Sequence, residues 1–193
     1  MGNEIFAKAN ELKAYFADIR QQLHRHPEVG GKENHTAGLI RQELEKCGIE
    51  IVPISVPTGV VGLLHGKKAG SSQVTALRAD IDALPIVEKT GLSYASQQPG
   101  VMHACGHDGH TAMLLGAAKL LSTMTDQFSG TVKFIFQPGE ETLSGAKDMV
   151  EAGVLENPSV DSIAAVHSWP YLPVGVLGTW KGPYYASGDS FSV

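Results

Sequence analysis

Thr131-Val-Lys-Phe-Ile-Phe136 is the clearest strand signal in the chain, and Gln137-Pro-Gly-Glu-Glu141 follows it directly. The first six residues are rich in β-branched and aromatic side chains and alternate in character, which is typical of a strand in a sheet. Pro and Gly then end the strand, and two adjacent carboxylates come just after that end. Ligands of open α/β sheets bind beyond the carboxyl ends of strands, so the same stretch predicts a place for a site.

Helical and extended patterns alternate on both sides of this strand. An amphipathic helix is predicted from about Ile5 to His26, where Pro27 disfavours its continuation. The other predicted elements are a helix over 34–47, strands over 49–54, 60–64 and 74–77, a helix from about 110, a helix over 144–152 and a strand over 162–166. This alternation predicts an α/β fold with a mixed, largely parallel sheet and helices on both faces.

Composition places the chain among soluble globular proteins. It has 193 residues, 42% hydrophobic and 18% charged, enough for one good core. The net charge of −5 and the scattered basic residues exclude nucleic acid and anionic membrane as expected partners. No apolar stretch approaches the roughly 20 residues that span a bilayer. Only Cys47 and Cys105 are present, too few for a disulfide framework, so we expect a cytoplasmic protein, with Cys47 in the core.

The segment His103-Ala-Cys-Gly-His-Asp-Gly-His110 combines one thiol, three imidazoles and one carboxylate in eight residues. These groups are together the ligands of zinc and neighbouring transition metals. Cys105 alone would more often be a small buried hydrophobe. With His107 two residues further on, and with glycines at 106 and 109 that let the backbone turn, metal ligation is the favoured interpretation. The segment therefore predicts a metal site, most simply a hydrolytic one.

Further polar residues come directly after predicted strands, and they could converge with the segment His103–His110 at one edge of the sheet. Glu140 and Glu141 could start a helix, or one could bind metal while the other faces substrate, because neighbouring side chains diverge. His167 is either a core histidine or a ligand. Asp80 and Asp82 are turn residues or acceptors that hold a ligating imidazole, and we favour the second role for at least one. The remaining histidines are interpreted as structural or exposed: His24, His26, His35 and His65.

Several segments occur in the same order in the M20 family of metallopeptidases. They are His24-Arg-His-Pro-Glu28, Arg78-Ala-Asp-Ile-Asp-Ala-Leu-Pro85, His103–His110, Gln137–Glu141 and Val166-His167. The chain resembles the amidohydrolase branch of that family, which includes hippurate hydrolase, N-acyl-amino-acid amidohydrolases and auxin-conjugate hydrolases. The resemblance covers essentially the whole chain.

This resemblance implies a site with two divalent metal ions and a reaction that hydrolyses the amide bond of small N-acyl amino acids. The ligands it implies are Cys105, His107, Glu141 and His167. Glu140 is implied as the general base that takes a proton from the attacking water, and Asp82 as a residue that orients a ligand. Asp80 stands where other branches place a ligand histidine, and Cys105 compensates. A thiolate ligand favours Zn, Mn, Co or Ni over Mg or Ca.

The resemblance also divides the chain. Residues 1–184 match the N-terminal part of a catalytic domain, and residues 185–193 resemble the start of an inserted lid and dimerisation domain. Complete family members continue with that domain, which makes them homo-oligomers, and then with a segment that carries one more ligand histidine. We therefore expect a truncated chain that is inactive alone. The alternative function is a non-catalytic metal-binding or interaction fragment.

Overall fold

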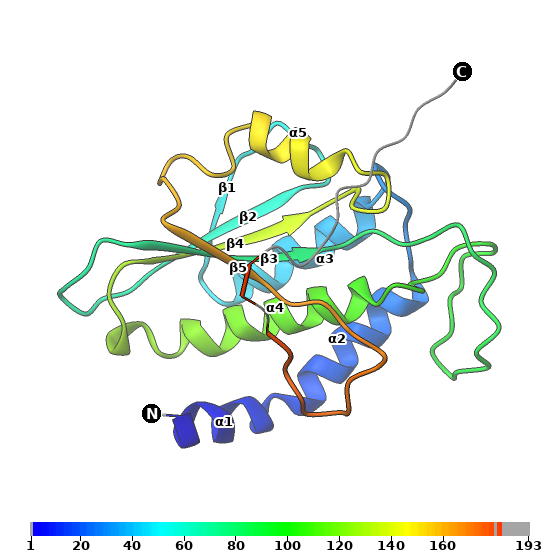
Figure 1. Cartoon of the computed structure of the whole chain (residues 1–193), viewed down its shortest axis with the longest axis horizontal. Coiled ribbons are helices and arrows are strands. Elements are labelled where there is room, and N and C mark those ends of the chain that lie inside the picture. Colours follow the sequence, from blue (N-terminus) through cyan, green and yellow to red (C-terminus); the bar gives the residue numbers. More distant parts are fainter. Residues whose placement is uncertain (1, 180, 183–193) are drawn as a thin grey trace.

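The computed structural model describes residues 2–179 and 181–182 as a layered α/β structure (Figure 1). In chain order its elements are α1 (Gly2–Glu11), α2 (Lys13–Arg25), α3 (Asn34–Lys46), β1 (Glu50–Val52), β2 (Val60–His65), β3 (Val74–Asp80), α4 (His107–Ser122), the 3-10 turn η1 (Thr125–Gln127), β4 (Thr131–Gln137), α5 (Gly145–Glu151) and β5 (Ser162–Ala165). The expected domain boundary near residue 184 lies outside the described residues.

The described strands form one five-stranded sheet in the order β1-β2-β4-β3-β5. β3 pairs in parallel with β4 and β5, whereas β1 with β2 and β2 with β4 are antiparallel pairs. The expected mixed sheet is confirmed, and its parallel part is confined to three neighbouring strands. In this part Asp80, at the end of β3, is the register partner of Gln137, at the end of β4. The loops after these two strands therefore begin side by side.

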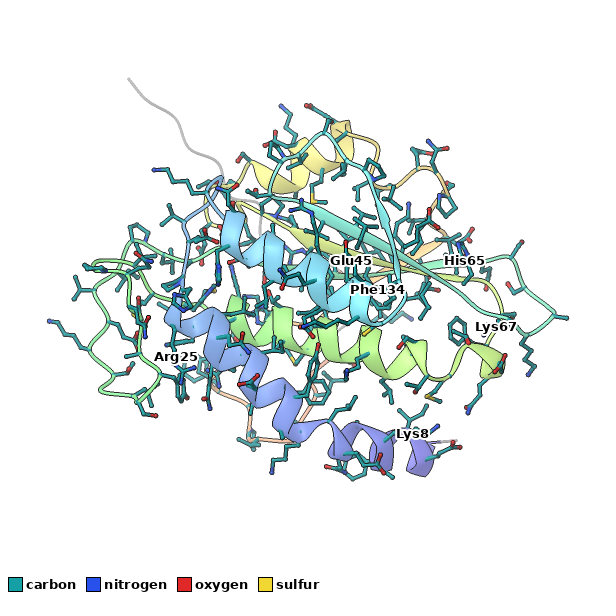
Figure 2. All side chains as sticks on the ribbon, turned by 180° about the vertical axis from the view of Figure 1, so that it is seen from behind. Lys8, Arg25, Glu45, His65, Lys67 and Phe134 are labelled. Atoms are coloured by element: carbon teal, nitrogen blue, oxygen red, sulfur yellow. The ribbon has the colours of Figure 1, made fainter. Side chains whose placement is uncertain are left out.

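Helices cover both faces of the sheet, as expected (Figure 1). One face carries α2, α3 and α4, and the larger core lies between them and the strands; Phe134 of β4 is fully buried there (Figure 2). The opposite face carries α5, which buries Met149 against a smaller cluster with Val61, Ala76 and Ile135. Cys47, expected in the core, is half-buried at the end of α3 and packs against the larger cluster.

Several element boundaries differ from the sequence-based expectation. The strand expected over 74–77 continues to Asp80, and the strand expected over 49–54 is shorter, Glu50–Val52. The single N-terminal helix is divided at Leu12 into α1 and α2. The helix expected from about residue 110 begins three residues earlier, at His107. Gly106 precedes α4 and has a φ of 97°. This left-handed backbone conformation is strained for a residue with a side chain, so glycine is suited to the turn that leads into α4. The early start places His107 in the first turn of a long helix.

Within residues 2–179 and 181–182, none of the helices has the length and apolar character needed to cross a bilayer.

Candidate metal centre

Loops and helix starts at the carboxyl ends of β3, β4 and β5 bring the predicted site residues together. Among the described residues there are two overlapping sets of donor atoms, and the atoms of each set all lie within 4.8 Å of one another. The first set contains Cys105, His107 and Glu141. The second contains Asp80, His107, His110 and His167.

The first donor set fits a divalent cation. His107 is fully buried, yet its Nε2 has no hydrogen-bond partner among the described residues, and the same holds for the buried Oε1 of Glu141. These two atoms are 3.9 Å apart. A buried polar atom without a partner is costly, and a cation between them would satisfy both. Cys105 Sγ, which completes the set, lies 3.6 Å from Nε2 of His167. The residues that could hold metal are thus Cys105, His107, Glu141 and His167.

Asp82 holds two of these candidate ligands. Its backbone carbonyl and its Oδ1 lie 2.9 Å and 3.2 Å from Nδ1 of His107. Its other carboxylate oxygen, Oδ2, accepts a hydrogen bond from the backbone N–H of Glu141 at 3.0 Å. With the Nδ1 proton directed at Asp82, Nε2 of His107 keeps its lone pair for the donor set.

Asp80 is occupied by other partners. Its Oδ1 lies 2.6 Å from Nδ1 of His110, and its Oδ2 accepts a hydrogen bond from Nη1 of Arg78 at 2.8 Å. Burial alone would raise the pKa of Asp80, but the His110 hydrogen bond and the charges of His107 and Arg78 hold that pKa at about 2. Asp80 is therefore an ionised carboxylate that anchors other side chains.

Glu140 lies beside the donor set but is more open to solvent. Its Oε2 is 3.8 Å from Nε2 of His107, and 37% of its side chain is exposed. Burial and the neighbouring carboxylates of Glu141 and Asp80 raise the pKa of Glu140, against the opposing charges of His107 and Arg78. A carboxylate that is open to solvent and more basic than usual is suited to accept a proton from water.

Negative charge surrounds the thiol and the imidazole. Burial and the nearby charge of Glu141 raise the pKa of Cys105 to about 12, so the metal-free thiol is protonated. Burial would lower the pKa of His107, but the Asp82 hydrogen bond and the charges of Asp80 and Glu141 raise it overall. A metal ion would reverse both effects, because a coordinating thiol loses its proton and a coordinating imidazole is neutral.

The other histidines take varied places. His24, expected to be structural or exposed, is buried, with Nδ1 2.8 Å from Asp108 Oδ2 and Nε2 3.2 Å from Glu88 Oε1. His103 is buried and belongs to neither donor set, and burial lowers its pKa to about 4. His110 was not predicted as a site residue. Its position three residues after His107 on α4, one helical turn away, is the signal that could have found it.

The fold and the donor atoms define a class: an α/β domain with a candidate site for divalent metal ions at the carboxyl ends of its parallel strands. The sequence profile of Peptidase family M20/M25/M40 matches residues 76–183. The chain belongs to that family.

Two curated relatives and one solved structure indicate which members it resembles. The chain is 47% identical over 177 residues to the N-acetylcysteine deacetylase of Bacillus subtilis, an alignment that covers 91% of this chain and 46% of that protein. It is 44% identical over 183 residues to the hippurate hydrolase of Campylobacter jejuni, covering 95% of this chain and 47% of that protein.

The crystal structure of the Bacillus subtilis YXEP protein, a dinuclear metal binding peptidase from the M20 family, superposes with a TM-score of 0.85. It shares 44% sequence identity, and the match covers 90% of this chain and 48% of that one. The chain thus spans about half the length of the relatives it matches.

Proposed function

We propose that this chain forms the metal-binding part of a hydrolase that cleaves the amide bond of small N-acyl amino acids. One observation carries the proposal: the Glu140 carboxylate lies beside a donor set in which His107 Nε2 and Glu141 Oε1 are buried and, within the part of the chain that the structure describes, have no hydrogen-bond partner. The names of two relatives, an N-acetylcysteine deacetylase and a hippurate hydrolase, support N-acyl amino acids as the substrate class.

The metal content follows from the donor chemistry. We propose two divalent ions, drawn from Zn, Mn, Co or Ni, because a thiolate favours these over Mg and Ca. The similarity to a dinuclear metal binding peptidase supports the number. As ligands we propose Cys105, His107, Glu141 and His167.

Each protein group has a defined task in the proposed reaction. When bound, the metal ions would polarise the substrate carbonyl and lower the pKa of water. Glu140 accepts a proton from the attacking water and passes it to the leaving nitrogen, so that the products are a carboxylic acid and an amino acid. Asp82 keeps the His107 ring and the backbone at Glu141 in place through its three contacts.

The wider organisation also remains a proposal. Residues 1–184 would form the N-terminal part of a catalytic domain, and a lid and dimerisation domain would begin at residue 185 and assemble the protein as a homo-oligomer. The span of about half the length of the relatives supports this division. A cytoplasmic location is proposed because both cysteines are free.

The adjacent glutamates provide a matched test of the proposed roles. Glu140→Gln keeps the shape of the side chain and removes its ability to accept a proton. Because Glu140 is not a proposed ligand, the zinc or manganese content should stay unchanged. Glu141→Gln removes a charged ligand and should lower that content. In a full-length protein that contains this sequence, Glu140→Gln should abolish hydrolysis of hippurate and N-acetylcysteine while the metal stays bound.

Elemental analysis separates the possible failures. Equal metal loss in the two glutamine variants would show that the base and the ligand are wrongly assigned. If Cys105→Ala combined with His107→Ala leaves the metal content unchanged, the site itself is wrong.

A further inference from the structure

Ser168 contacts both the thiol-bearing loop and the exposed candidate ligand next to it in sequence. Its Oγ donates a hydrogen bond to the carbonyl of Cys105 at 3.1 Å. Its own carbonyl accepts one from Nδ1 of His167 at 2.7 Å. Its backbone N–H donates to Nε2 of His110 at 2.8 Å. One residue therefore connects Cys105, His167 and α4.

The bonds of His110 fix its tautomer. A backbone N–H can only donate, so Nε2 of His110 must carry a lone pair towards Ser168. The ring proton is then on Nδ1, which donates to Oδ1 of Asp80 at 2.6 Å. Only 1% of the side chain is exposed, and both ring nitrogens are used. His110 thus has no nitrogen free for a metal, although its atoms lie within a donor set.

Asp80 ties this arrangement to the rigid part of the sheet. Its Oδ2 is held by Arg78, whose guanidinium also donates to Oε1 of Gln137 at 2.9 Å and 2.7 Å. Its backbone carbonyl accepts a hydrogen bond from the Thr111 hydroxyl at 3.1 Å. β3 and β4 thus fix Asp80, whereas β5 is exposed at all four of its positions and His167 is exposed beyond it. The segment that carries His167 needs such an anchor.

From these contacts we infer that Asp80, His110 and Ser168 form a positioning relay that sets the place and tautomer of His167 opposite Cys105. Because Nδ1–H of His167 donates a hydrogen bond to the Ser168 carbonyl, the proton stays on Nδ1, and the unprotonated Nε2 faces Cys105 Sγ at 3.6 Å. A neutral nitrogen in that orientation is the form that binds a metal ion. The inference rests on the proposed function and assigns positioning roles to His110 and Ser168, neither of which is a proposed ligand.

Two substitutions at His110 separate the two halves of the relay. The amide of Asn reaches about as far as Nδ1, so His110→Asn can still bond Asp80 but cannot reach Ser168. The longer Gln side chain reaches about as far as Nε2, so His110→Gln can still accept from Ser168. Loss of a residue that orients a ligand typically costs about 10- to 100-fold in metal affinity. We expect a weakening of that size in His110→Asn and a smaller one in His110→Gln.

Titration of the whole chain with Co²⁺ measures this effect without any assay of catalysis. The thiolate-to-cobalt absorption reports the bond to Cys105, and the d–d bands report the number of ligands. Thr111→Val is the matched control: it removes another hydrogen bond to Asp80 but leaves His110 and Ser168 in contact, so it should lower stability and leave Co²⁺ affinity unchanged. A purely structural role for His110 would make His110→Asn and Thr111→Val behave alike.

NMR of the histidine rings tests the relay in the unmodified chain. Long-range ¹H–¹⁵N spectra should show His110 and His167 as Nδ1–H tautomers, and His167 should lose that preference in His110→Asn. An Nε2–H tautomer for His110 in the unmodified chain would overturn the inference. So would unchanged Co²⁺ affinity in His110→Asn while Cys105→Ala weakens binding. If Cys105→Ala also leaves Co²⁺ binding unchanged, the proposed metal centre fails, and the relay fails with it.

Discussion

Glu33 Oε1 accepts a hydrogen bond from the backbone N–H of Gly139 at 2.8 Å, across 106 positions of sequence. Glu33 is fully buried just before α3, and its other oxygen has no partner among the described residues. Gly139 directly precedes Glu140 and Glu141. The start of α3 therefore fixes the loop that carries the proposed base and one proposed ligand.

The loss of stability on replacing Glu33 should depend on whether the new side chain still offers an acceptor to the Gly139 N–H. Glu33→Ala leaves the Gly139 N–H buried and unpaired, and we expect it to lower the free energy of unfolding by about 1–3 kcal/mol. Glu33→Gln keeps an oxygen for that N–H and should cost less. Urea denaturation of both variants measures the difference. Equal losses would show that the hydrogen bond to Gly139 contributes nothing.

The contact between α2 and α4 depends on a glycine. A Cβ at Gly116 would lie 1.4 Å from Cε1 of Phe16, so Gly116→Ala should lower stability by about 1–3 kcal/mol through overpacking. On the same helix, a Cβ at Gly109 would meet only Nε of Arg20, at 3.9 Å. Gly109→Ala should therefore stabilise by up to about 1 kcal/mol through helix propensity.

Thermal unfolding of these two variants, with Phe16→Leu added to Gly116→Ala, tests the overpacking. The smaller side chain at residue 16 should restore part of the lost stability. No recovery would show that the Phe16 ring is not the obstacle.

The buried His24 predicts a pH dependence of stability. The hydrogen bond to Asp108 and the nearby Glu88 raise the pKa of His24 despite its burial, and Arg20 and His103 are the cationic and titratable groups beside this cluster. A raised folded-state pKa means that the protonated form stabilises the fold. This contribution is complete below the unfolded pKa, about 6.5, and is lost as the pH rises through the higher folded-state value.

The comparison that tests this dependence is between the unmodified chain and His24→Asn. The difference in their free energies of unfolding should be larger at pH 5.5 than at pH 9. A difference that stays constant over this range, or grows with pH, would contradict the charged pairing of His24 with Asp108.

A buried lysine holds the segment that follows α5. Lys133 of β4 is 1% exposed, and its Nζ donates to the backbone carbonyls of Val154, Glu156 and Pro158 at 3.0, 2.8 and 2.8 Å. Lys133→Met keeps the apolar stem but leaves these carbonyls without their donor. We expect a loss of at least about 1.5–3 kcal/mol, the range for one hydrogen bond to a charged group.

Lys147→Met is the control for the loss of charge. Lys147 is exposed and, among the residues described, forms an ion pair with Glu151 alone, at 3.7 Å, so its replacement should change stability by less than about 1 kcal/mol. Guanidinium denaturation of both methionine variants gives the comparison. Similar small losses would show that the carbonyl contacts of Lys133 are not stabilising.

Much of the fold follows from patterns that act locally. The β-branched run at 131–136 and the apolar spacing of α3 and α4 depend on neighbouring residues, so sequence alone locates them well. The convergence of Asp82, His107 and Glu141 was foreseeable because parallel strands end at one edge of a sheet. Strand direction is different: the apolar pattern of β1 and β2 is the same for either direction, and the antiparallel half of the sheet depends on distant pairing.

The site was less predictable where function depends on long-range contacts. His24 was expected to be structural or exposed; it is buried and structural, but its partners Asp108 and Glu88 come from far along the chain, where no local pattern reveals them. The role of His110 depends on Ser168, 58 positions away, which no local pattern reveals. The division of α1 from α2 at Leu12 was missed because the helical spacing of apolar residues continues through it.

The position of Lys133 also determines which alignments of the strands are possible. In β4 it lies opposite Ala76 of β3 and Leu63 of β2, on the face of the sheet that α5 covers. On that face its ammonium group donates hydrogen bonds to three backbone carbonyls. A slip of one residue would turn this side chain to the other face, into the larger core, where a charge without partners costs several kcal/mol. We therefore expect Lys133 to disfavour a one-residue slip of β4, which would also move Gln137 out of register with Asp80.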